Sequence, residues 1–131
     1  MIPTHLADAS AWSQLFRNDV AARLVPLLVG GGAATCGIVD LQVLATFDDP
    51  DERAQAAVER AMFPRIAIDD RVLDRAAEVQ TLVADVPVMA LIVAAAAERA
   101  NLILLHDDEA YERIAAVTHQ PVEAVLAAGW P

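Results

Sequence analysis

The sequence predicts a single α/β domain in which a central parallel sheet has helices on both faces. Short apolar segments suited to buried strands alternate with helical patterns over all 131 residues, and this alternation is typical of parallel sheets covered by helices. The length fits one domain, and the 56% of residues that are hydrophobic suffice for a single core. We therefore expect one three-layer α/β/α domain spanning residues 1–131.

The first half of the chain is expected to contain two strands and four helices. The strands are placed at residues 2–7 and 33–39, and the helices at 9–17, at 20–29, after Asp40, and from the acidic turn at 48–52 to about residue 62. Trp12, Leu15 and Phe16 have the spacing of one helix face. The glycine run 30–32 ends the second helix, and Asp40 is placed as an N-cap.

The second half continues the alternation. Strands are placed at 64–68, 102–105 and 120–125, and helices at 71–83, 87–99 and 107–116. The helix that Pro87 opens is almost wholly Ala, Leu, Ile and Val, so it must be buried on most of its faces. Residues 102–105 are four apolar residues in a row, which is typical of a central parallel strand.

Composition excludes several classes of chemistry. There are 9 basic residues against 19 acidic ones, a formal net charge of −10, and every basic residue is arginine. The absence of lysine excludes a Schiff base, a P-loop lysine and the lysine of a phosphate-accepting receiver domain. The single cysteine, Cys36, excludes an internal disulfide and a cysteine-based zinc site, and it suits a reducing compartment.

Signals for export or membrane insertion are missing from the sequence. The N-terminus lacks a basic region and reaches Asp8 at once. The longest charge-free run, residues 24–39, contains Pro26 and three glycines and is shorter than the roughly 18 apolar residues of a spanning helix. We therefore expect a cytoplasmic protein without a membrane association.

Aspartates follow three of the predicted strands. Asp8 follows the first strand, Asp40 the second, and Asp108, with its neighbours His106 and Asp107, follows the strand at 102–105. Ligands of parallel sheets bind beyond the carboxyl ends of the strands, and converging carboxylates repel each other unless a cation lies between them. The pattern therefore predicts a site for Mg²⁺ or Mn²⁺ and metal-assisted attack on a phosphodiester.

Plainer interpretations accompany these residues. Aspartates are also favoured helix N-caps, so spacing alone leaves capping open as an alternative to a metal site. His106 is interpreted as a hydrogen-bonding residue and not a ligand, Cys36 as a buried apolar residue, and Trp12 as part of the core or an interface. Trp130 is expected to make a contact or to be disordered.

Four segments resemble PIN-domain ribonuclease toxins of the VapBC type. Residues 6–12, LADASAW, resemble the family's opening D-x-S-A-W, and residues 35–44, TCGIVDLQVL, resemble the segment with its second acid. Residues 104–115, LLHDDEAYERIA, resemble the L-H-x-D-x-D-F-x-x-I-A stretch, and residues 116–123, AVTHQPVE, resemble the tail of these toxins. The four segments stand in the family's order and cover nearly the whole chain.

The resemblance implies a PIN-like fold and a Mg²⁺- or Mn²⁺-dependent endoribonuclease. Asp8, Asp40 and Asp108 match acids that hold the metal and carry catalysis, and Ser10 matches the hydroxyl that supports the first acid. Asp40 stands where the family usually has glutamate. The family's remaining acid position, before an apolar helix, is occupied by Ala90 in this chain.

The resemblance also implies partners and leaves alternatives. Expected partners are a VapB-like antitoxin, the RNA substrate, and a second copy of the chain bound through the apolar N-terminal helices. One alternative is a catalytically impaired PIN domain that mainly binds its antitoxin, because Ala90 replaces an acid. Another is an unrelated acidic α/β binding module, such as a receiver-like domain, which the absence of lysine disfavours.

The net charge argues against RNA binding, since nucleic-acid surfaces are usually basic. Two arginine pairs have helical spacing that places each pair on one helix face: Arg71 with Arg75, and Arg53 with Arg60. Solvated salt bridges explain these pairs equally well.

Overall fold

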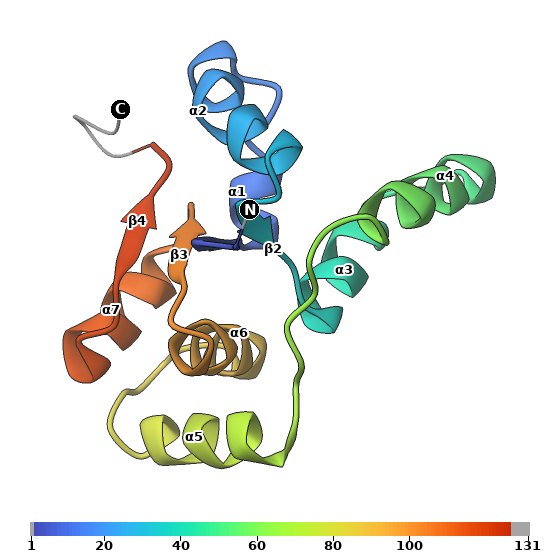
Figure 1. Ribbon diagram of the computed structural model, residues 1–131. Helices are drawn as coiled ribbons and strands as arrows, with labels where there is room; N and C mark the ends of the chain where they lie inside the picture. Colours follow the sequence, from blue (N-terminus) through green and yellow to red (C-terminus); the bar gives the residue numbers. More distant parts are fainter. Residues whose placement is uncertain (1, 127–131) are drawn as a thin grey trace.

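The structure is a computed structural model that describes residues 2–126 (Figure 1). Met1 and residues 127–131 lie outside the described part, and with them the prediction for Trp130. Along the chain the elements are β1 (His5–Ala7), α1 (Ala9–Trp12), α2 (Asn18–Val29), β2 (Ala33–Ala34), α3 (Gly37–Leu44), α4 (Pro50–Arg60), α5 (Asp70–Gln80), α6 (Val88–Arg99), β3 (Ile103–His106), α7 (Glu109–Thr118) and β4 (Val122–Ala124).

The sheet is parallel and has the order β2-β1-β3-β4. β1 lies between β2 and β3, with Leu6 opposite both Ala34 and Leu104. The carboxyl ends of these strands therefore meet at one edge, which is where parallel sheets carry their ligand sites. The predicted fold class is confirmed.

Helices cover both faces of the sheet, as Figure 1 shows. Leu6 and Leu104 belong to the larger core cluster, which includes residues of α5, α6 and α7. Ala7 and Leu105, one residue further along each strand, belong to a second cluster with α1 and α2. This alternation follows from strand geometry, because successive side chains point to opposite faces.

Three predicted elements are shorter than expected, and Asp40 changes its role. The first strand and the first helix cover only His5–Ala7 and Ala9–Trp12. β2 ends at Ala34, and α3 begins at Gly37 with Cys36 as its N-cap. Asp40 thus lies in the first turn of α3 and is not its N-cap. A short apolar run does not distinguish a strand from a buried helical turn, and this is why residues 37–39 were misassigned.

The strand predicted at 64–68 is also wrong. Only Arg65 forms a bridge, parallel to Thr35, through two backbone hydrogen bonds: Thr35 N–H to the Pro64 carbonyl and Ile66 N–H to the Thr35 carbonyl, each 2.8 Å long. Pro64 has no N–H to donate to a ladder. The bridge still fixes the backbone of Arg65 directly beyond the end of β2.

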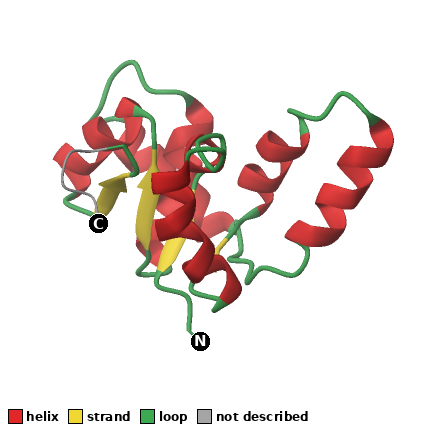
Figure 2. Cartoon of the chain, turned by 90° about the horizontal axis from the view of Figure 1, so that it is seen from above, coloured by secondary structure: helices red, strands yellow, loops and turns green. Residues whose placement is uncertain are grey.

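Helices α3 and α4 form an arm that leaves the body of the molecule, as Figures 1 and 2 show. Asp49 caps α4 by accepting a hydrogen bond from Glu52 N–H, and Pro50 occupies the first turn. The last residue of α4, Arg60, is buried although the preceding turns are largely exposed. Among residues 2–126, no helix is long and apolar enough to span a bilayer.

Leu104→Ala should lower the free energy of unfolding by about 3 kcal/mol. Leu104 is fully buried in β3, so removing most of its side chain leaves a cavity in the core. Leu82→Ala is the matched control, since Leu82 is 59% exposed, and it should change stability by less than about 0.5 kcal/mol. Urea unfolding followed by circular dichroism measures both. Equal effects of the two substitutions would contradict the assignment of the core.

Candidate active site

Asp8 is a buried carboxylate at the carboxyl end of β1. It is 4% exposed and caps α1, accepting hydrogen bonds at Oδ2 from Ser10 N–H (3.0 Å) and from the Ser10 hydroxyl (2.6 Å). The Tyr111 hydroxyl donates to Oδ1 at 2.7 Å. All three donors are neutral, and no ion pair reaches Asp8 from residues 2–126. Asp8 is therefore the N-cap of α1, and its role as a metal ligand stays a prediction.

The Tyr111 hydroxyl stays protonated beside Asp8. Burial raises the pKa of Tyr111 far above its usual range, and the negative charges of Asp8 and Asp108 raise it further. A protonated phenol is a donor, so Tyr111 supplies Asp8 with a hydrogen bond that a phenylalanine would not. Tyr111 contacts both Asp8, through its hydroxyl, and the backbone of Asp108, whose carbonyl accepts from Tyr111 N–H at 3.1 Å.

Asp108 lies at the end of β3 and is exposed. Its Oδ1 accepts a hydrogen bond from Ala110 N–H at 3.0 Å and so caps α7. Asp107 connects the loop after β3 to the loop after β1, because its N–H donates to the Ser10 hydroxyl oxygen at 2.9 Å. Ser10 thus bridges Asp8 and the loop of Asp108, and its supporting role in a functional site stays a prediction.

Asp40 is buried, at 5% exposure, and two arginines pair with it. Arg60 Nε donates to Oδ1 at 2.8 Å, and Arg65 Nη2 donates to Oδ2 at 2.5 Å. The Thr35 hydroxyl donates to Oδ1 at 2.7 Å and accepts from Arg60 Nη2 at 3.0 Å. Two positive charges therefore face one negative charge at the start of α3.

Arg60 is held in place from both sides. Its side chain is 5% exposed, and its guanidinium carbon lies 4.5 Å from the ring centroid of Trp12 and 5.6 Å from that of Phe63. The two rings stack on each other with centroids 5.3 Å apart. Cation–π attraction and the ion pair with Asp40 act together, so this guanidinium is fixed and largely desolvated.

A cavity of about 410 Å³ adjoins this cluster between α1, α3 and α4. Its walls are mostly apolar and include Trp12, Val43, Phe47 and Phe63, with Arg60 on one side. Trp12 lines this cavity and packs against the core, which confirms the prediction of a core residue.

Cys36 and Ala90 are buried members of the larger core cluster. Burial raises the pKa of the Cys36 thiol, and the charges of Asp40 and Asp8 raise it further, so the thiol is inert and lies near both acids. Ala90, on α6, is 4% exposed and belongs to the same core cluster as Cys36 and Tyr111. An apolar side chain thus stands in the core at the family's acid position.

His106 acts as the hydrogen-bonding residue that the sequence predicted. Its Nδ1 accepts from Asp108 N–H at 3.1 Å, and its Nε2 lies 2.9 Å from Glu112 Oε2. Since Nδ1 is an acceptor, Nε2 carries the proton and donates to Glu112. His106 therefore orients the loop that carries Asp108.

The sequence did not indicate Thr35, Arg65 or Tyr111 as residues of the site. It placed Arg60 with Arg53 on one helix face, whereas Arg60 pairs with Asp40. The contacts of Asp40 span 20 and 25 residues along the chain, so no local spacing signals them. Tyr111 was visible only as a tyrosine where the family motif has phenylalanine.

The divalent cation that the sequence resemblance implies fits Asp8 and Asp108 better than it fits Asp40. Asp8 is a buried charge without a counter-ion in the described chain, and a bound cation would stabilise such a group. Asp40 already faces two guanidinium groups. Among residues 2–126, no three His, Cys, Asp or Glu side chains are grouped closely enough to hold one metal ion. The assignment of all three aspartates as metal ligands stays a prediction.

Comparisons with known proteins agree with this architecture. A family model described as PIN domain matches residues 6–117. Ribonuclease VapC21 of Mycobacterium tuberculosis is 36% identical over 136 aligned residues, which cover 98% of this chain and 99% of that protein. Ribonuclease VapC18 of the same species is 32% identical over 130 aligned residues, which cover 93% of this chain and 95% of that protein.

Solved structures share the fold. A chain of the DNA-bound VapBC structure from Salmonella typhimurium has a TM-score of 0.78 at 11% identity, covering 95% of this chain and 99% of that one. A toxin–antitoxin complex from Klebsiella pneumoniae has a TM-score of 0.74 at 16% identity, covering 93% and 98%. At these identities the likeness extends to the fold alone.

Tyr111→Phe should lower the free energy of unfolding by about 1–3 kcal/mol, since it removes a hydrogen bond from a buried carboxylate. The raised pKa of Tyr111 means that the folded protein keeps the phenol protonated above pH about 10, where the unfolded chain loses the proton. The contribution of Tyr111 to stability is therefore complete below pH about 10 and decreases as the pH rises above it. Ser13→Ala, which removes an exposed hydroxyl, is the control for urea unfolding at pH 7 and 10.5. An unchanged stability of Tyr111→Phe at pH 7 would refute the contact.

Arg60→Met should lower the free energy of unfolding by about 3 kcal/mol, because it breaks a buried ion pair. The double variant Arg60→Met/Asp40→Leu should be more stable than Asp40→Leu alone, because Asp40→Leu leaves the buried Arg60 guanidinium without its carboxylate. Thermal and urea unfolding measure the coupling. Additive losses from the two single substitutions would show that the pair does not act as a unit.

Proposed function

Because the chain belongs to the PIN-domain family and, within it, to the VapC proteins, we propose that it is the toxin of a type II toxin–antitoxin pair and hydrolyses phosphodiester bonds of RNA. The observation that carries this proposal is the buried Asp8 carboxylate. It lies beside the loop of Asp108 at the carboxyl edge of the sheet and has only neutral partners in the described chain. That edge is where a parallel sheet positions a substrate.

The proposed centre is dependent on Mg²⁺ or Mn²⁺, with Asp8 and Asp108 as the residues that would hold the ion. When bound, such an ion lowers the pKa of a water and stabilises charge on the phosphate. Ser10 orients the Asp8 carboxylate with two hydrogen bonds. In this proposal Asp108, which is exposed, accepts a proton from the attacking water. Asp40 completes the set of acids, although its carboxylate is paired with Arg60 and Arg65.

The proposed partner is a VapB-like antitoxin, because the solved structures that share this fold include VapBC complexes. The net charge of −10 would steer a basic segment of such a partner towards the chain. A homodimer through the N-terminal helices stays a prediction; Phe16 and Val29 of that region are 80% and 83% exposed. The RNA substrate and the free thiol of Cys36 suit action in the cytoplasm.

A second candidate function is a catalytically impaired PIN domain that mainly binds its antitoxin. Two observations favour it: Ala90 is buried where the family has an acid, and Asp40 is already neutralised. In this candidate the interaction surface is retained and cleavage is lost. The two candidates differ in whether the chain as it stands cuts RNA.

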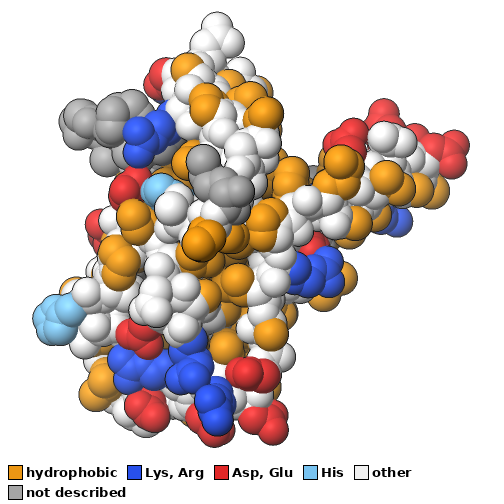
Figure 3. Space-filling view, viewed as in Figure 1, with side chains coloured by type: hydrophobic (Ala, Val, Ile, Leu, Met, Phe, Trp, Pro, Cys, Tyr) orange, Lys and Arg blue, Asp and Glu red, His pale blue; other side chains and the backbone are white. Residues whose placement is uncertain are grey.

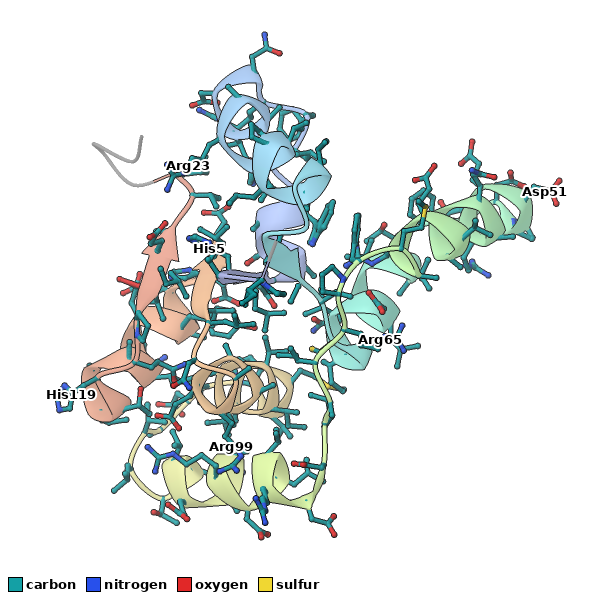
Figure 4. All side chains as sticks on the ribbon, in the orientation of Figure 1. His5, Arg23, Asp51, Arg65, Arg99 and His119 are labelled. Carbon is teal, nitrogen blue, oxygen red and sulfur yellow. The ribbon has the colours of Figure 1, made fainter. Side chains whose placement is uncertain are left out.

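Cleavage of total RNA with Mn²⁺, and with EDTA as the blank, tests the proposal. The native chain should cut RNA, Ala90→Asp should raise the rate, and Asp8→Asn in the Ala90→Asp background should lower it by about a hundredfold. Asp51→Asn is the matched control, because Figure 4 labels Asp51 at the far end of α4. Melting temperature with and without Mn²⁺ reports the ion directly, since a bound ligand raises stability.

The outcomes separate the candidates. Cleavage by Ala90→Asp but not by the native chain would establish the second candidate. Unchanged cleavage when Asp8→Asn is added to Ala90→Asp would refute the assignment of the site.

A further inference from the structure

Arg65 has an exposed guanidinium group, and it shares its carboxylate partner, Asp40, with Arg60. Its side chain is 59% exposed, whereas Asp40 and Arg60 are buried. One carboxylate serves two guanidinium groups there, so the three residues carry a net charge of +1. This local surplus lies in a chain whose net charge is −10.

Most of the other described arginines whose contacts are known are engaged elsewhere. Arg75 is bidentate with Glu98 and also pairs with Glu78, Arg17 pairs with Asp19, and Arg53 and Arg113 donate to backbone carbonyls. Arg65 differs because its partner, Asp40, already has the buried Arg60. A guanidinium has five N–H donors in a planar fork that matches a phosphate. With one Nη2–H on Asp40, the exposed part of the Arg65 fork remains available for an anion.

The backbone of Arg65 is fixed at the functional edge of the sheet. The parallel bridge to Thr35 holds it beyond the end of β2. β2 is the neighbour of β1, and Asp8 directly follows β1. Figure 4 labels Arg65 at the root of the α3–α4 arm, and Figure 3, in the same orientation, shows arginine surface exposed there. A pre-positioned guanidinium loses less freedom on binding than one on a mobile loop.

We propose that Arg65 binds a backbone phosphate of single-stranded RNA, with Arg60 as the buried charge that keeps Asp40 from neutralising it. The proposal rests on the proposed function, from which it takes RNA as the substrate. It divides the site into an anionic part, Asp8 and Asp108, and a cationic part at Arg65. A phosphodiester lying across the edge of the sheet would meet both parts.

Equilibrium binding of a fluorescent single-stranded RNA of 12 nucleotides, in EDTA so that cleavage does not interfere, tests the role of Arg65. Arg65→Gln should weaken binding about tenfold at low salt and reduce the slope of log affinity against log salt by about 0.7, the value of one phosphate contact on a single strand. Arg65→Lys should retain most of the salt slope, because it keeps the charge.

Arg99→Gln is the matched control, since it makes the same change of net charge at an exposed residue. Arg99 ends α6 on the side where β3 begins, away from the acid edge, and Figure 4 labels it beside α5. Binding by Arg99→Gln should equal that of the native chain. Melting temperatures of all variants check that each is folded, because Arg65→Gln also removes an ion pair with the buried Asp40.

Three results would overturn the inference: equal RNA affinity of Arg65→Gln and the native chain, equal losses for Arg65→Gln and Arg99→Gln, or no RNA binding by the native chain. The inference would also be overturned if Arg65→Gln lowered the affinity for a polyglutamate peptide and left the affinity for RNA unchanged. That result would identify an acidic protein segment as the ligand of Arg65. The cleavage assay remains separate, because RNA binding through Arg65 without cleavage would support this inference while the nuclease proposal fails.

Discussion

The burial of two carboxylates at one edge of a parallel sheet is the constraint on which the rest of the structure depends. A buried charge is costly unless it is paired or fully hydrogen-bonded, and the chain meets this requirement in two ways. Asp8 receives three neutral hydrogen bonds, whereas Asp40 receives two guanidinium groups and a hydroxyl. The first arrangement leaves a negative charge for a cation to bind, and the second leaves a positive charge for an anion.

The same contacts attach the α3–α4 arm to the body. Arg60 ends α4 and reaches Asp40 in the first turn of α3, so one ion pair closes the base of the arm. Five residues later, the bridge between Arg65 and Thr35 ties the returning chain to the end of β2. Displacing either arginine from Asp40 would therefore loosen the arm, and movement of the arm would change the charge at the acid site. The position of the arm therefore affects how far Arg60 and Arg65 neutralise Asp40.

Sequence reasoning succeeded where the determinants are local and failed where they are distant. The D-x-S pattern located Asp8 with Ser10 because the capping geometry of Asp8 is confined to three consecutive residues. The strand predicted at 33–39 was too long, because β2 ends at Ala34 and the helix begins at Gly37, in an apolar run whose pattern suits both structures. Arg65 was missed because its meeting with Asp40 depends on how the arm folds back, which no spacing along the chain encodes.

Net charge and local charge act at different distances, and this resolves the conflict between an acidic chain and an RNA substrate. At physiological ionic strength, charges more than about 8 Å apart are largely screened, so a phosphate in contact with Arg65 responds to the local surplus of +1 and not to the total of −10. At low ionic strength the screening length is longer, so the net charge also acts during approach, where it repels RNA and attracts a basic protein. If the proposed function is correct, such a chain would meet its antitoxin faster than RNA at low ionic strength and would bind RNA only through close contacts. Inhibition by a basic partner would then be fast, and RNA would bind well only when that partner is absent.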